Sequence, residues 1–86
     1  MSSSTGMDSM KVYGRSSDAP DKLLLMDEVS FLAGPEQLRS LARFFLAQAE
    51  TQESAQGADH AHYSDSRDAI PSEVEIVVAD PAAFPA

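Results

Sequence analysis

Two histidines one residue apart, His60 and His62, come closest to a ligand set in this sequence. On an extended strand, alternate residues project to the same side, so both imidazoles would face one way. Asp59, Asp65 and Asp68 could add oxygen ligands. A zinc site needs four convergent ligands, however, and the chain has no third histidine and no cysteine. The pair is more typical of solvated or structural histidines, with a pH-sensing role as an alternative, and no cofactor is expected.

Two pairs of carboxylates, Asp27 with Glu28 and Glu73 with Glu75, resemble acid/base pairs by composition alone. A glycosidase-type site needs a deep cleft, which a fold of about 70 residues hardly builds. Exposed carboxylates of this kind instead suit a basic protein surface, because complementary potentials speed association and fix orientation. The two pairs are therefore candidates for partner binding.

Enzymatic chemistry has little support elsewhere in the chain. Its serines lie in the first residues and in turns, and none has the spacing of a nucleophile beside a base. The four glycines are scattered singly, so no phosphate-binding loop is present. We therefore expect a binding protein and no enzyme.

The length and charge of the chain restrict its class. Eighty-six residues allow one small core, and the absence of cysteine excludes a disulfide scaffold. No apolar run is long enough for a membrane span, and the Ser-rich start lacks the pattern of a signal peptide, so the cytoplasm is expected. A net charge of −8 disfavours direct binding of nucleic acid or anionic lipid. We expect a leader at 1–9, one domain at 10–80 and a flexible tail at 81–86.

The first element expected is a β-hairpin. Residues 10–13 alternate as a half-buried strand does, and dense turn chemistry follows at 14–21. The second strand is expected within 23–33, with a bulge or a strand break near Asp27, because Asp27 interrupts the apolar parity of the segment.

A helix is predicted to begin at Pro35, after Gly34, and to continue to about residue 50. At 100° per residue Phe44 lies about 120° from the apolar stripe, so Phe44 is expected to be at least partly exposed beside Arg43. It is therefore a further candidate for partner binding. The stripe expected to face the core consists of Leu38, Leu41, Ala42, Phe45 and Ala49.

Two further strands are expected after the helix. Residues 59–64 are consistent with a short edge strand, and 72–80 alternate β-branched residues with glutamates. The predicted fold class is α+β: a small antiparallel sheet of three to four strands, in the order β-β-α-(β)-β, with one amphipathic helix packed on one face.

Four segments of the chain together resemble a known family. They are KVYGRSS, LMDEVSFLAGPEQLRSLARFFLAQAE, HAHYSD and EIVVADP, within residues 10–81. The strand-to-helix run with its Pro-Glu-x-Leu-Arg start, followed by the His-x-His aromatic segment, resembles the Imm32-type immunity proteins of bacterial polymorphic toxin systems. The leader, the helix exit TQESAQGADH and the proline-bearing tail depart from that pattern.

The resemblance implies a cytoplasmic antitoxin that binds a cognate toxin and holds it inactive. The charge of −8 adds the inference that the toxin is a basic protein, for example a nuclease whose cleft the carboxylates would cover. An alternative is a small subunit that homodimerises through a sheet edge or the Phe44 side of the helix. The residues expected to contact a partner are Asp27, Glu28, Phe44, His60, His62, Glu73 and Glu75.

Overall fold

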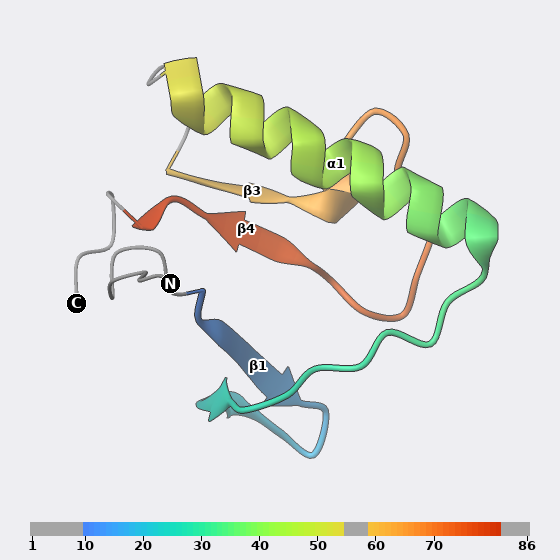
Figure 1. Ribbon diagram of the computed structural model, residues 1–86. Coiled ribbons are helices and arrows are strands. Elements are labelled where there is room, and N and C mark those ends of the chain that lie inside the picture. The colour runs from blue at the N-terminus through green and yellow to red at the C-terminus, as the bar shows by residue number, and fades with distance from the viewer. Residues whose placement is uncertain (1–9, 55–58, 82–86) are drawn as a thin grey trace, which may run out of the picture. The chain divides into compact units, whose positions relative to one another are not determined.

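The computed structural model describes residues 10–54 and 59–81 (Figure 1). Its contacts divide the chain between Leu32 and Ala33 into two compact units, which are treated separately below as the N-terminal and the C-terminal unit. The expected leader at 1–9 and all but the first residue of the expected tail lie outside the described residues.

The N-terminal unit is an antiparallel hairpin of β1 (Val12–Ser16) and β2 (Ala19–Met26). Residues 17 and 18 form the turn, where the backbone N–H of Asp18 donates to Ser16 Oγ at 3.1 Å. The predicted hairpin is therefore present. Of the two features predicted near Asp27, a bulge or a strand break, the structure has the strand break, because β2 ends at Met26. The register shift lies elsewhere, in β1 between Gly14 and Ser16.

The second strand of the hairpin begins at Ala19, before the predicted range of 23–33, and ends at Met26, within it. The tight turn fixes the pairing so that Met26 lies opposite Val12, at the start of β1. Residues 27–33 have no partner strand and do not form a β-strand, although their alternating apolar residues suggested one. The apolar side chains of β2 lie on both faces of the hairpin and are largely exposed. They therefore add little buried area to a two-stranded hairpin, which is only marginally stable alone.

The helix α1 (Pro35–Ser54) begins as predicted. Its first backbone bond runs from Leu38 N–H to the carbonyl of Gly34 at 3.0 Å, which makes Gly34 the capping residue. The helix continues about one turn beyond the predicted end, since the sequence holds no glycine between Gly34 and Gly57 and no proline between Pro35 and Pro71.

The C-terminal sheet pairs β3 (His60–His62) with β4 (Val77–Ala79) in antiparallel register. The expected strand at 59–64 is thus present over three residues, after which the 3₁₀ turn Tyr63–Asp65 follows. The strand predicted at 72–80 is shorter than expected. The chain turns away after His62, so residues 72–76 have no strand to pair with.

The core of the C-terminal unit lies between α1 and the inner face of this sheet (Figure 1). Leu41, Phe44 and Tyr63 are buried. Ala61 and Val78, which lie opposite each other across the two strands, pack against them from the sheet, together with Ala69 and Ile76. One helix with small antiparallel sheets confirms the predicted α+β class and element order, but the strands are divided between two sheets.

The helix face that meets the sheet differs from the predicted one. Of the predicted stripe only Leu41 is buried, whereas Leu38 and Phe45 are substantially exposed and Phe44 is 4% exposed. The prediction of an exposed Phe44 is therefore wrong. The buried face combines apolar and polar side chains, and hydrogen bonds to the Tyr63 hydroxyl satisfy Gln37 and Ser40. Its buried or half-buried members are Gln37, Ser40, Leu41, Phe44, Gln48 and Thr51.

None of the helices within the described residues is long and apolar enough to cross a membrane.

Candidate functional site

The outer face of the β3–β4 sheet carries both histidines. Directly opposed residues of an antiparallel pair share a face, and His60 lies opposite Ala79 while His62 lies opposite Val77. Ala61 lies between them in sequence and points to the core. We call this surface the histidine face and define it as Asp59, His60, His62, Glu75, Val77 and Ala79.

Each histidine of this face has a carboxylate beside its Nδ1 atom. His60 Nδ1 lies 2.9 Å from Asp59 Oδ1, and His62 Nδ1 lies 3.5 Å from Glu75 Oε2. Proximity to a carboxylate assigns the proton of a neutral imidazole to Nδ1 and leaves Nε2 as the acceptor. The two rings meet edge to face, with centroids 5.3 Å apart. The imidazoles are thus oriented before any partner arrives.

Glu75 is held by four groups from three residues, Ser64, Ile76 and His62. Its Oε1 accepts hydrogen bonds from the backbone N–H groups of Ser64 at 3.1 Å and Ile76 at 3.0 Å. Its Oε2 accepts from the Ser64 hydroxyl at 2.5 Å and lies beside His62. The hydrogen bond from the Ser64 hydroxyl is the largest cause that lowers the pKa of Glu75 below its ordinary value of 4.5. Desolvation opposes it, and the two backbone donors and the charge of His62 lower the pKa further.

The lowered pKa of Glu75 predicts a dependence of stability on pH. Because folding favours the ionised form, the contribution of Glu75 is present at pH values above its ordinary pKa of 4.5 and is lost as the pH falls through the lower folded-state pKa. Carboxyl carbon NMR should show Glu75 titrating below its ordinary value of 4.5 in the folded protein. A pKa of Glu75 at or above that value would contradict the hydrogen-bond network.

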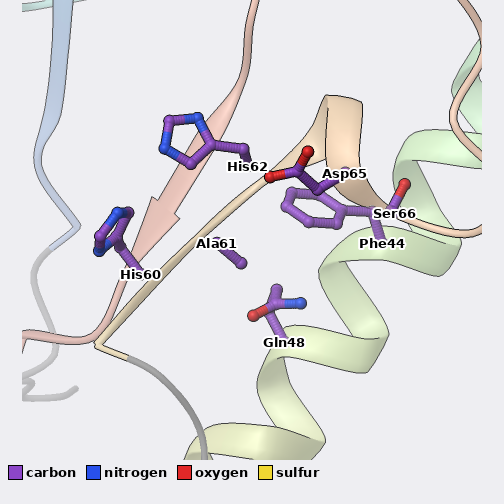
Figure 2. A pocket seen from close by; sticks show the side chains of 7 residues that line it. All are labelled: Phe44, Gln48, His60, Ala61, His62, Asp65 and Ser66. Carbon is purple, nitrogen blue, oxygen red and sulfur yellow. The ribbon is translucent and has the colours of Figure 1, made fainter.

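A shallow, open depression lies beside β3, and Figure 2 shows its lining. Ala61 points toward Phe44 and Gln48 on α1, whereas His60 and His62 project from the other side of the strand. The imidazoles and Phe44 therefore do not enclose one common ligand chamber. The lining consists of Phe44, Gln48, His60, Ala61, His62, Asp65 and Ser66.

The hydroxyl of Tyr63 organises the opposite side of the site. Ser40 Oγ donates its single proton to the carbonyl of Asp68 at 2.7 Å, so the 2.5 Å contact between Tyr63 and Ser40 is a bond donated by the phenol. The phenol oxygen accepts from Gln37 Nε2 at 3.0 Å and from Ile70 N–H at 2.9 Å. This residue fixes the turn that follows β3 against α1.

Sequence reasoning missed this tyrosine and its partners. Tyr63 and Ser40 are separated by 23 positions, and a mid-helix serine next to apolar residues was the one available signal of a buried hydroxyl contact. A surface ion pair from Arg43 Nε to Asp68 at 3.3 Å joins the same two segments. Because both of its side chains are about half exposed, this pair adds little stability.

The structure brings together only part of the predicted contact set. His60, His62 and Glu75 share the histidine face, and Glu73 lies exposed in the segment leading to β4. Phe44 is buried in the core. Asp27 and Glu28 belong to the N-terminal unit. Among the residues that the structure describes, no three histidine, aspartate or glutamate side chains are grouped so as to hold a metal ion.

Comparison with known proteins gives one match. No curated protein and no solved structure matches the chain. The family described as Immunity protein 32 matches residues 28–81, which is more than half of the 86 residues. The matched range covers the end of the N-terminal unit, all of α1, and the β3–β4 sheet with its histidine face. It begins after the KVYGRSS segment, which formed part of the resemblance. The chain therefore belongs to the Immunity protein 32 (Imm32) family.

Proposed function

We propose that this protein binds and neutralises a cognate toxin of a bacterial polymorphic toxin system, in the cytoplasm and by protein–protein contact without catalysis. The observation that carries the proposal is the match of residues 28–81 to the Immunity protein 32 family. Antitoxin action of this kind needs a stable surface complementary to the toxin and no reaction centre.

The histidine face is the contact surface that the geometry of the C-terminal unit favours. Its side chains are exposed or half-exposed, and hydrogen bonds already fix two of its polar groups, His60 through Asp59 and Glu75 through Ser64. A preorganised surface loses less conformational entropy on binding. Val77 is about half exposed at its centre and adds an apolar contact.

The charge of the protein favours a basic toxin. A net charge of −8 attracts a positively charged surface and raises the association rate. A nuclease with a basic nucleic-acid cleft is one such partner, and Asp59 and Glu75 would then occupy positions where phosphates lie. Glu73 of the C-terminal unit would extend this acidic contact, and Asp27 and Glu28 of the N-terminal unit are separate candidates for contact with the toxin.

Co-expression with the protein encoded immediately upstream is the direct test. We expect a stable complex in pull-down and restored growth when that neighbour is toxic. The same chain carrying His60→Ala, His62→Ala and Glu75→Gln should rescue growth less well. A folded wild-type chain that forms no complex with the neighbour and gives no rescue would contradict the proposal.

Removing the charge of Glu75 should slow association with the toxin. Glu75→Gln keeps the shape and the acceptor for Ser64 N–H but removes one negative charge, so association at low salt should be about two- to fivefold slower. Stopped-flow or surface-based kinetics at several salt concentrations would measure the rate. Glu53→Gln removes the same charge near the end of α1 and should leave the rate close to wild type. Equal slowing by both variants would remove the histidine face from the interface.

A further inference from the structure

The helix α1 has a second apolar face that the β3–β4 sheet does not cover. Leu38 is 47% exposed and Phe45 is 41% exposed, and Ala42 and Ala49 are also exposed. At 100° per residue, these four residues form a stripe about 120° from the buried face of the helix. We call them the outer seam: Leu38, Ala42, Phe45 and Ala49. Leu46, at 65% exposure, lies beside it.

The spacing of the outer seam is that of a two-helix interface. Its members follow one another at intervals of four, three and four residues, which is the d-a-d-a pattern of a helix that packs against another helix. The seam carries no charged side chain. A basic toxin surface is therefore a poor match for it, in contrast to the acidic histidine face on the sheet side of the same unit.

The order of large and small residues along the seam is self-complementary. In an antiparallel pair of identical helices with a two-fold axis between positions 43 and 44, Leu38 lies level with Ala49 of the other copy. Ala42 then lies level with Phe45. Every layer combines one large with one small side chain, which permits close and even packing.

Parallel pairing of the same helices would pack less well. It would place Phe45 against Phe45 and Ala42 against Ala42, so that one layer is crowded and the next is hollow. In the antiparallel arrangement Arg39 of one copy lies level with position 48 of the other, two residues from Glu50. The opposite charges of Arg39 and Glu50 then attract each other.

We propose that two copies of this protein associate through the outer seam as an antiparallel, two-fold symmetric pair of α1 helices. The sheet and the seam lie on different sides of α1, so both histidine faces stay outside the helix contact. The dimer could then hold two toxins. The proposal rests on the packing of α1 and is independent of the toxin-binding function.

The physical properties of the seam define how this dimer should behave. From Leu38 to Ala49 the seam is only about 16 Å long at 1.5 Å per residue, so the dimer should be weak and concentration-dependent. Each copy has a charge of −8, so added salt should screen repulsion and strengthen the dimer. Salt should have the opposite effect on binding to a basic toxin, which separates the two interactions experimentally.

Replacing each of two alanines of α1 by glutamate tests the seam. Ala42 lies in the seam and Ala47 lies on α1 outside it, and both are exposed. Ala42→Glu places an unpaired carboxylate against Phe45 of the other copy, so the dimer should weaken by about 100-fold or more. Ala47→Glu adds the same charge and should dimerise nearly as wild type. Sedimentation equilibrium over a concentration series would measure both, with circular dichroism to verify that the helix is retained.

The orientation can be tested by disulfide trapping, because the sequence contains no native cysteine. When Ala42→Cys and Phe45→Cys variants are mixed under mild oxidation, cross-links between the two variants should exceed those within either one. Predominant cross-links between identical variants would overturn the antiparallel arrangement. A wild-type chain that stays monomeric throughout the series, or an Ala42→Glu variant that dimerises as tightly as wild type, would overturn the proposal.

Discussion

Replacing Phe44 by alanine should remove about 3–5 kcal/mol of stability, the largest single loss expected in this protein. Phe44 is 4% exposed and belongs to the core with Leu41 and Tyr63, whose ring meets it edge to face at a centroid distance of 5.5 Å. A small domain has only about 5–15 kcal/mol in total. The cavity should therefore leave little net stability, measured as a lower urea midpoint or as loss of cooperative unfolding.

The neighbouring phenylalanine is the matched control. Phe45 has the same side chain on the same helix but is 41% exposed, so Phe45→Ala should cost about 1 kcal/mol when measured at concentrations where the chain is monomeric. Phe44→Leu, which leaves a smaller cavity, keeps the comparison measurable if the alanine variant does not fold. A larger loss from Phe45→Ala than from Phe44→Ala would contradict the observed orientation of α1.

The helix illustrates both the reach and the limit of sequence reasoning. Its first turn was predictable because Gly34 and Pro35 act locally. Its orientation was not, because α1 has two apolar faces and local periodicity cannot rank them. The polar residues Ser40 and Gln37 were not part of the stripe predicted to face the core, whereas the hydroxyl of Tyr63 makes their burial favourable.

The strands show a similar division. Turn chemistry between Gly14 and Asp21 correctly predicted a hairpin, but the register determines where each strand ends. The same holds for the strand predicted at 72–80, of which only Val77–Ala79 forms β4. Residues 72–76 lack a partner because β3 ends at His62, and the length of a partner strand is not encoded locally.

The histidine face was partly predictable as well. The alternation of a strand correctly indicated that His60 and His62 share one side. The link of Glu75 to Ser64 spans 11 positions and depends on how the segment between β3 and β4 returns. The buried position of Phe44 excludes it from that surface.

The second large loss of stability is expected at Tyr63, whose hydroxyl binds the polar residues buried beside Phe44. Tyr63→Phe should cost about 2–3 kcal/mol, although it keeps the ring and the core volume. The lost hydroxyl leaves Ile70 N–H and Gln37 without their acceptor and Ser40 Oγ without its donor. For a domain of this size the midpoint of thermal unfolding should fall by about 10 °C or more, as circular dichroism would show.

Two further variants determine whether this loss arises from the hydrogen-bond network. Tyr13→Phe removes the same hydroxyl from an exposed tyrosine that has no hydrogen bond within the described part of the chain, so its stability should equal that of wild type. Ser40→Ala removes one member of the network and should be strongly non-additive with Tyr63→Phe, because either change breaks the shared 2.5 Å bond. Additive losses in the double variant would mean that the bond between Tyr63 and Ser40 contributes no coupling energy, since independent contacts contribute independently to the free energy of unfolding.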